Sequence, residues 1–196
     1  MAYSANKSLL IRLARIWAKP LWWGASKSVN FGVLQQDVDR WIECIGNDAL
    51  KPLDTYSRFA YLAGALPEFR NVVHYRLRPS ALPVRILLKR LYRPDGTIIL
   101  EADTIGPGLF LHHGNGIMIS ATSIGKNFWI NQHASLGYNA KGRPTVGDNV
   151  TIAAGAVVTG PITLGDDVTV GANAVVIKSV PSGTIMVAPI AQKLER

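Results

Sequence analysis

An aliphatic residue recurs at every sixth position along the second half of the chain. A helix repeats about every 3.6 residues and a strand about every 2, so a period of six fits neither element alone. The period is typical of a parallel β-helix, in which each hexapeptide forms one flat side of a three-sided coil and its aliphatic residue fills the interior. The residues in phase are Ile105, Leu111, Ile117, Ile124, Ile130, Leu136, Val146, Ile152, Val158, Leu164, Val170 and Val176.

Two irregularities interrupt this lattice. One extra residue precedes Ile124, and ten residues separate Leu136 from Val146, so that four residues are inserted. We expect the insertion to form a protruding loop over Gly137–Thr145. The lattice predicts four coils, and the residues that begin them are Ile105, Ile124, Val146 and Leu164.

The first half of the chain has helical patterns instead. We expect a domain boundary at the Asp95-Gly96 turn, with a helical N-terminal domain over residues 1–96 and the β-helix over 97–196 with a short tail after Pro181. Pro20 should end or kink the first helix, and Asp54 or Thr55 should cap the third. The expected helices are Lys7–Lys19, Gln36–Ile45, one that begins near Asp54, one that runs from Pro67 to Leu77, and a fifth that Pro79 and Pro83 bracket, with Ile86, Leu87 and Lys89–Tyr92.

The net charge of +8 arises entirely in the first half of the chain. Residues 1–100 hold 15 Lys and Arg against 7 Asp and Glu, and residues 101–196 hold 6 against 6. Such an excess can attract an anionic ligand, a membrane surface or nucleic acid. We expect no nucleic-acid partner, because no recognition motif or aromatic-studded basic strand accompanies the charge.

The first predicted helix is amphipathic. Leu9, Leu13, Ile16 and Trp17 share one face, and Arg12, Arg15 and Lys19 share another. A helix of this kind can lie on a membrane. The alternative, which we favour, is that the apolar face packs within an oligomer, so residues 7–19 are not expected to bind membrane.

The chain has the features of a cytoplasmic protein. Its single cysteine, Cys44, suits a reducing compartment and is expected to be a small buried hydrophobic residue. The N-terminal residues lack the apolar stretch and cleavage site of a signal peptide, and no run approaches the ~18 apolar residues of a membrane span.

Equal positions of successive coils form columns on the outside of a β-helix. Two positions after the interior residues of the second side come His113, Gln132, Ala154 and Ala172. If they share a column, its two methyl side chains leave a shallow groove that ends at an imidazole. Such a groove suits a long, thin ligand whose reactive end meets a general base. The alternative is that His113 is an ordinary surface residue.

The other histidines are expected to have different roles. His112 should point away from His113 and be structural or substrate-facing, and His74 should pack or form hydrogen bonds on its helix. His133 lies three positions after Ile130, at a different phase from His113. A β-helix zinc site needs three converging imidazoles, so we expect no metal.

Both halves of the chain resemble a known family. The lattice, the helical first half and GLFLHHGNGIMIS (108–120) are similar to the serine acetyltransferase-like branch of the left-handed β-helix acyltransferases, and so is DTYSRFAYLAGALPEFRNVVHYRL (54–77). Members found among surface-polysaccharide genes resemble the chain more closely, in SIGKNFWINQ (123–132), GRPTVGDNV (142–150) and GPITLGDDVTVGANAVV (160–176). The resemblance implies a mainly β fold, namely a left-handed parallel β-helix of about four coils preceded by an α-helical N-terminal domain.

The resemblance also implies site residues. His113 matches the family's catalytic base by motif. The family forms homotrimers and binds acetyl-CoA in the cleft between neighbouring subunits, where Gly137, Ala154 and Ala172 correspond to lining residues. Lys178 resembles a lysine near the nucleotide phosphates. His112, Tyr138 and Arg143 are then expected to bind the acceptor.

Departures from the pattern bear on the acceptor. The family's Arg-His-Pro in the loop before the third coil is Gly142-Arg143-Pro144 here, without the histidine. The aspartate that orients the catalytic histidine falls near Ile98, and Asp95, Glu101 and Asp103 do not match it. We therefore expect an acetyl-CoA-dependent O-acetyltransferase that acts on a sugar hydroxyl in surface-polysaccharide biosynthesis. The alternatives are a serine O-acetyltransferase of cysteine biosynthesis and a non-catalytic trimeric scaffold.

Overall fold

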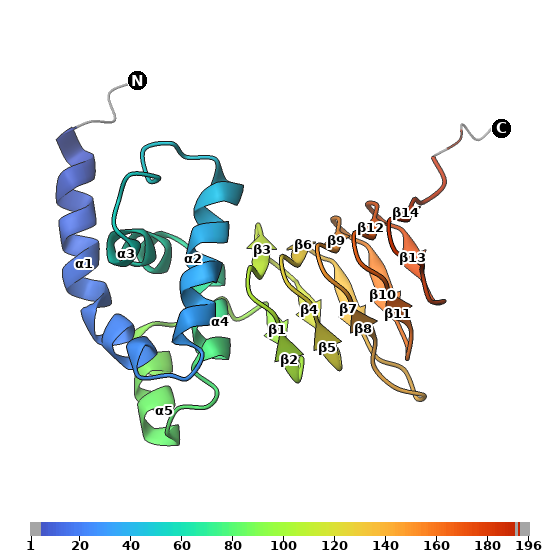
Figure 1. Cartoon of the computed structure of the whole chain (residues 1–196), viewed down its shortest axis with the longest axis horizontal. Helices are drawn as coiled ribbons and strands as arrows, with labels where there is room; N and C mark the ends of the chain where they lie inside the picture. Colours follow the sequence, from blue (N-terminus) through green and yellow to red (C-terminus); the bar gives the residue numbers. More distant parts are fainter. Residues whose placement is uncertain (1–4, 191, 193–196) are drawn as a thin grey trace. The chain divides into compact units, whose positions relative to one another are not determined.

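The computed structural model describes residues 5–190 and 192. The chain divides into two compact units (Figure 1). The helical unit contains the residues up to Ile98 and, further along the chain, Gly106–Phe110. The β-helix unit contains Ile99–Ile105 and the chain from Leu111 onward.

The helical unit confirms the predicted helices and extends two of them. Asp54 caps the third helix, because its Oδ1 accepts a hydrogen bond from Ser57 N at 3.0 Å. Pro67 occupies the first turn of the fourth helix, where its missing N–H leaves no hydrogen bond unmade. The helices are α1 (Ala5–Ser26), α2 (Phe31–Ile45), α3 (Thr55–Ala65), α4 (Pro67–Arg76) and α5 (Leu82–Leu91).

Pro20 does not end the first helix. Helix α1 continues through it to Ser26, and its ribbon changes direction part-way along (Figure 1). A proline inside a helix removes one backbone hydrogen bond and bends the axis. The continuation is stabilised by burial, because Leu21 and Ala25 beyond the proline are 0% and 1% exposed.

A buried ion pair ties Gly106–Phe110 to the helices of its unit. Asp37 on α2 accepts hydrogen bonds from Arg76 Nε at 2.7 Å and from the backbone N–H of Gly108 at 2.7 Å and Leu109 at 3.1 Å. Arg76 also donates to Gly106 O at 2.6 Å, and the Trp41 indole donates to Leu109 O at 2.7 Å. Since Asp37, Arg76 and Trp41 are buried, this network fixes the backbone immediately before the third β-strand.

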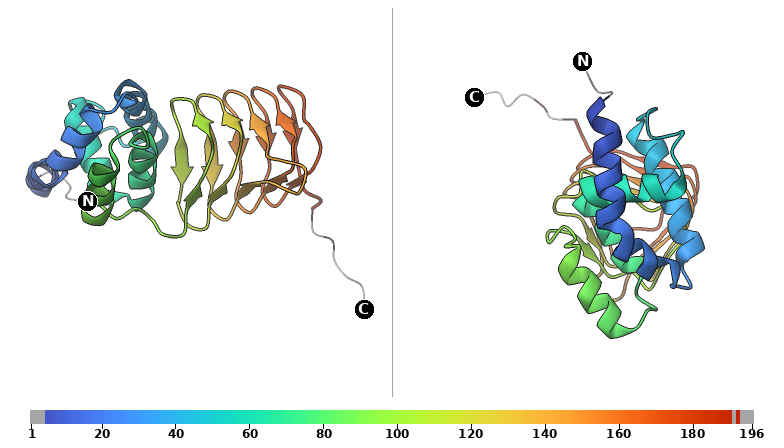
Figure 2. Two further views of the ribbon diagram at one scale, coloured as in Figure 1. Left: turned by 90° about the horizontal axis from the view of Figure 1, so that it is seen from below. Right: turned by 90° about the vertical axis from the view of Figure 1, so that its left-hand side faces the viewer.

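The β-helix unit has three parallel sheets, one for each side of the coil (Figure 2). We name each sheet by its first strand. The β1 sheet contains β1 (Ile99–Leu100), β4 (Met118–Ile119), β7 (Ser135–Gly137), β10 (Val157–Thr159) and β13 (Val175–Val176). The β2 sheet contains β2 (Thr104–Ile105), β5 (Ser123–Ile124), β8 (Thr145–Val146) and β11 (Thr163–Leu164). The β3 sheet contains β3 (Phe110–His112), β6 (Trp129–Asn131), β9 (Thr151–Ile152), β12 (Thr169–Val170) and β14 (Ile185–Met186).

The predicted parallel β-helix is thus confirmed, with a little more of it than expected. Strand β1 precedes the four predicted coils and β14 follows them, which gives about five turns. The segment expected to be a tail over the last coil includes β14, in which Ile185 and Met186 pair with Thr169 and Val170. All twelve aliphatic residues of the lattice are buried, none exposed by more than 7%.

The register differs from the predicted lattice at one place. Ile119, and not Ile117, pairs with Leu136. The turn between β3 and β4 is therefore two residues longer than the next turn on that corner, and Ile124 follows Ile119 by five positions instead of the regular six. Both isoleucines are fully buried, so a buried aliphatic residue stood at each of two candidate positions and the spacing alone could not choose between them.

Candidate active site

His112 is the last residue of β3, and His113 begins the long turn that follows. We call this turn, residues 113–117, the histidine turn. His113, Gly114 and Gly116 adopt left-handed backbone conformations, with φ of 61°, 54° and 68°. Asn115 N donates to His113 O at 2.6 Å and closes the turn. Glycine adopts positive φ without steric cost, so the sequence HHGNG can form a wide turn that leaves His113 exposed.

His113 does not share a column with the two alanines, contrary to our prediction. Gly155 N donates to Gln132 O at 3.2 Å and Asn173 N donates to Ala154 O at 3.0 Å, so Gln132, Ala154 and Ala172 do form one column, here called the alanine column. In the first coil, His133 N donates to Asn115 O at 2.9 Å. Asn115 therefore stands where His113 was expected, and the two extra residues of the turn displace the imidazole from the column.

The alanine column begins with a polar group that can still form a hydrogen bond. Gln132 Oε1 is buried and has no hydrogen-bond partner among the residues that the structure describes. A buried amide oxygen is costly to leave unpaired. It can accept a hydrogen bond from a ligand that binds at this corner, beside the small side chains of Ala154 and Ala172.

The ring of His112 is oriented by an amide of the next coil. Its Nδ1 lies 2.6 Å from Asn131 Oδ1, and Asn131 Nδ2 donates to Ile152 O at 3.4 Å. Because the amide uses its N–H toward the carbonyl, its oxygen faces the imidazole, and His112 carries a proton on Nδ1. Trp129 lies edge-on to the same ring, with centroids 5.1 Å apart.

The structure brings His112 and His113 together. Their rings stack with centroids 3.8 Å apart and planes inclined by 30°, although we expected His112 to point elsewhere. Sequence reasoning also missed Asn131 and Trp129 as neighbours of the pair. The signal was present, because Asn131 follows Ile130 as His112 follows Leu111.

His74 forms a hydrogen bond within the helical unit, as predicted, and His133 lies apart from the histidine pair in the coil. His133 lies at a regular corner of the coil, and a Cβ atom added to Gly116 in the coil before it would lie 2.7 Å from His133 Nδ1. His74 Nε2 donates to Tyr92 O at 2.7 Å, and burial lowers the pKa of His74 below its usual value, with a smaller contribution from the Lys89 and Arg70 cations. Within residues 5–190 and 192, no three His, Cys, Asp or Glu side chains are grouped so that they could hold a metal ion.

The remaining predicted site residues lie at a different corner, where the strands of the β1 sheet end. Leu136, Val158 and Val176 are paired in register, so Tyr138 and Lys178 each lie two residues beyond equivalent positions. The histidine turn and the alanine column lie at the corner where the same strands begin. A single chain therefore divides the predicted site residues between two corners of the β1 sheet and does not bring the two sets together.

The four-residue insertion forms the predicted loop after Gly137, and the structure shows that this loop is a small hairpin. Asn139 and Gly142 exchange two backbone hydrogen bonds of 3.1 Å, and Asn139 Oδ1 accepts from Lys141 N at 2.8 Å. Tyr138 at its base is 64% exposed. The loop is thus ordered by its own hydrogen bonds and presents an aromatic ring outward.

Arg143 is already paired within the chain. Its Nη1 and Nη2 donate to the two carboxylate oxygens of Asp103 at 2.9 and 2.7 Å, and Nη1 also lies 3.4 Å from Ala121 O. A two-point guanidinium–carboxylate contact fixes both side chains in orientation. This pair also places Asp103 against Arg143, at a corner other than that of His113.

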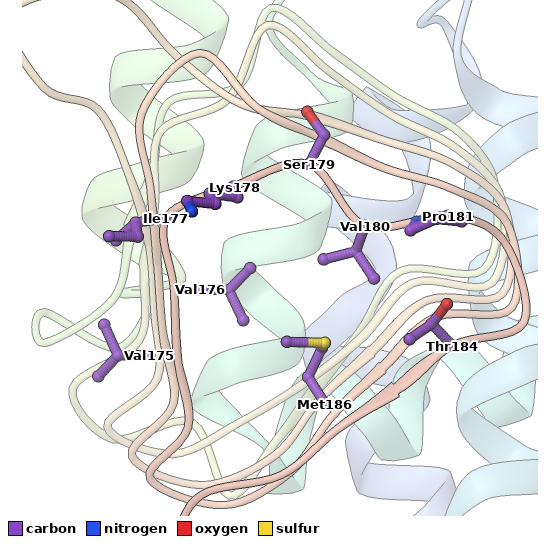
Figure 3. A pocket seen from close by; sticks show the side chains of 9 residues that line it. All are labelled: Val175, Val176, Ile177, Lys178, Ser179, Val180, Pro181, Thr184 and Met186. Carbon is purple, nitrogen blue, oxygen red and sulfur yellow. The ribbon is translucent and has the colours of Figure 1, made fainter.

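Lys178 lines a hollow of about 230 Å³ in the last coil (Figure 3). Val176, Val180 and Met186 point into this hollow (Figure 3), and Val176 and Val180 are buried interior residues. The hollow is therefore a continuation of the apolar core of the β-helix. Its lining is mainly apolar and also includes Lys178, Ser179 and Thr184.

Comparisons with known proteins agree with this architecture. Residues 143–178 match the family model described as bacterial transferase hexapeptide (six repeats). A serine acetyltransferase of Staphylococcus aureus (strain Mu50 / ATCC 700699) is 48% identical over 88 residues, which are 42% of this chain and 41% of that protein. One from Staphylococcus epidermidis (strain ATCC 12228 / FDA PCI 1200) is 46% identical over the same length. The match thus spans less than half the length of these relatives.

Solved structures give a wider match. Serine acetyltransferase 1 of Entamoeba histolytica in complex with L-cysteine has a TM-score of 0.60 at 26% identity, over 82% of this chain and 63% of that chain. The Neisseria gonorrhoeae serine acetyltransferase in complex with serine has a TM-score of 0.61 at 22% identity, over 84% and 68%, and shares the fold alone. The predicted resemblance to the serine acetyltransferase-like branch is confirmed, whereas the closer likeness to surface-polysaccharide enzymes gains no support from these relatives.

Proposed function

We propose that this chain is an O-acetyltransferase that uses acetyl-CoA as acyl donor and His113 as general base. The observation that carries the proposal is the histidine turn. Its exposed imidazole is stacked on a second imidazole whose proton position and orientation are set by Asn131. An imidazole titrates near neutral pH and can take a proton from a hydroxyl as the oxygen attacks an acyl group.

His113 is the only proton carrier that the reaction requires, between the acceptor hydroxyl and the leaving sulfur. His113 accepts the hydroxyl proton while the acceptor oxygen forms a bond with the thioester carbonyl carbon. The carbon–sulfur bond then breaks, and the imidazolium returns the proton to the leaving sulfur, which yields free CoA thiol and an acetyl ester. His112 and Asn131 orient the base, and no other cofactor is required.

Acetyl-CoA would lie along the alanine column. Its pantetheine arm is long and thin and contains amide N–H groups, one of which could pair with Gln132 Oε1. Ala154 and Ala172 leave room for the arm, while Gly137 and Lys178 lie at the other corner of the β1 sheet. These two sets would form one site if the second corner came from a neighbouring subunit, so we propose a homotrimer with three shared sites.

L-serine is the acceptor that the comparisons favour, because the relatives and solved structures described above are serine acetyltransferases. The predicted sugar acceptor is a second candidate because the loop presents Tyr138, whose exposed ring can stack on the C–H face of a sugar. Arg143 in the same loop is held in place by Asp103.

Release of free thiol from acetyl-CoA tests the proposal. The purified chain should be assayed with L-serine, hexoses, aminosugars and nucleotide sugars, and each product identified by mass spectrometry. We expect thiol release that depends on L-serine, together with O-acetyl-L-serine. Release with a sugar instead would establish the second candidate, and no acceptor-dependent release would favour the non-catalytic scaffold.

A further inference from the structure

Helix α1 exposes an apolar stripe along its outer side. Leu9, Leu13, Ile16 and Trp23 are 55%, 54%, 73% and 63% exposed. Spacings of four, three and seven residues place them on one side of a helix. Side chains on the opposite side, including Leu21, are buried. Single exposed aliphatic residues need no explanation, but a contiguous stripe marks an interaction surface.

Helix α5 lies against α1 in the same unit and is apolar on its outside too. Leu88 packs against Gly24 of α1, whose added Cβ would lie 2.6 Å from Leu88 Cδ1. Tyr92, directly after α5, donates from its hydroxyl to Trp17 O at 2.6 Å. The exposed aliphatic residues of α5 are Val84, at 36%, and Leu82, Ile86, Leu87 and Leu91, each between 57% and 61% exposed.

The charge on these two helices has a single sign. Arg12 and Lys19 are exposed beside the stripe of α1, and Lys89 and Arg90 lie in the last turn of α5. Arg15 is turned toward α3, where it pairs with Asp54 at 2.9 Å. Neither helix contains an acidic residue, and the first one in the chain is Asp37.

A hollow beside the stripe has the same apolar character. It encloses about 390 Å³ between α1 and α3. Leu10, Leu13 and Trp17 form one wall, and the small residues Gly64 and Ala65 form the other. A space of this shape and lining suits a hydrocarbon chain.

We infer that α1 and α5 form a docking surface for an anionic lipid bilayer. Aliphatic side chains would enter the region between head groups and acyl chains, and Arg12, Lys19, Lys89 and Arg90 would face the lipid phosphates. A second copy that meets this surface by a two-fold contact is a poorer occupant, because the same patch then lies on both partners and neither helix offers a carboxylate to the other's cations. None of the described helices is long and apolar enough to cross a membrane, which suits a helix that lies on the surface.

Vesicle flotation with the full chain tests this inference. Vesicles of phosphatidylglycerol and phosphatidylcholine are compared with vesicles of phosphatidylcholine alone, at low salt and at high salt. We expect binding to the anionic vesicles that weakens with salt. Ile16→Glu and the pair Arg12→Glu with Lys19→Glu should each weaken it by about tenfold or more. Ile190→Glu, which changes a 90% exposed side chain of the β-helix unit, is the matched control and should bind like wild type.

Two results would overturn the inference. One is absence of wild-type binding to anionic vesicles, or binding that the α1 variants leave unchanged. The other is a fall in solution mass on Ile16→Glu without any wild-type vesicle binding, which would assign the stripe to a second copy. Both α1 variants alter exposed side chains, so we expect their circular dichroism spectra to match that of wild type. A decrease in lipid binding can then be attributed to the surface of α1 and α5.

Discussion

His112 Nδ1 and Asn131 Oδ1 lie 2.6 Å apart across two successive coils of the β-helix. The amide holds the imidazole of His112 through its neutral oxygen. Since His113 stacks on the ring that Asn131 orients, the amide would act on the base through a second imidazole. Asn131 is therefore a positioning residue in the proposed mechanism.

Replacing Asn131 separates positioning from substrate binding. Asn131→Ala should lower kcat for acetyl transfer by about tenfold to a hundredfold, because a small displacement of a reacting group costs that much. The KM for acetyl-CoA should stay unchanged. Asn131→Asp keeps an acceptor oxygen and should recover most of the turnover. Equal losses in both variants, or a changed KM with kcat intact, would remove Asn131 from this role.

Removal of the base should be more severe. His113→Ala should lower turnover by about 10²–10⁴, while acetyl-CoA still binds, because the imidazole acts on the acceptor's proton. Turnover and equilibrium binding should be measured on the same preparations. His133→Ala, which changes a histidine at a regular corner, is the control and should lose less. Retention of more than about a tenth of wild-type turnover by His113→Ala would place the chemistry elsewhere.

The alanine column can be blocked by a bulky ring. Ala172→Trp should raise the KM for acetyl-CoA, and Ala154→Trp should do so to a smaller extent, because the indole would occupy the space of the pantetheine arm. Neither side chain belongs to the buried interior, so the melting temperature should change little. Thr163→Trp, at an exposed position of the β2 sheet, is a matched control. Unchanged acetyl-CoA affinity in both alanine variants would show that the donor binds elsewhere.

The sequence was sufficient for most of the fold because burial in a β-helix is periodic. All twelve lattice residues are interior, and Pro67 and Asp54 marked helix starts through their own backbone chemistry. It was insufficient at the histidine turn, where Ile117 and Ile119 are both buried and only strand pairing distinguishes them. The Asn131–His112 and Arg143–Asp103 contacts link residues 19 and 40 positions apart. His112 and Asn131 occupy equivalent lattice positions, so the spacing contained the signal for their contact, whereas the Arg143–Asp103 pair lies across the inserted loop and the spacing did not predict it.

Stability should depend on pH through His74. Burial lowers its pKa in the folded state below the value of about 6.5 expected for the unfolded chain. Between these two values the unfolded chain binds a proton that the folded chain does not, so the free energy of unfolding should fall as the pH drops below about 6.5. Urea unfolding at pH 7.5 and at pH 5.5 measures the change. His74→Gln can still donate to Tyr92 O and does not titrate, so it should reduce the pH dependence; an unaltered dependence would assign it to other groups.

Mixed oligomers test whether each site is shared between subunits. His113→Ala disables one corner of the β1 sheet, and deletion of residues 139–142 restores a plain hexapeptide spacing and disables the other, so each variant alone should be inactive. In a trimer whose sites combine both corners from neighbours, every mixed trimer retains one intact site of three. Random assembly of equal amounts makes about three quarters of the trimers mixed, so co-refolding should recover about one quarter of wild-type activity. Light scattering should give a trimer for both variants. A monomeric mass, or no recovery on mixing while both variants remain trimeric, would mean that each chain contains its whole site.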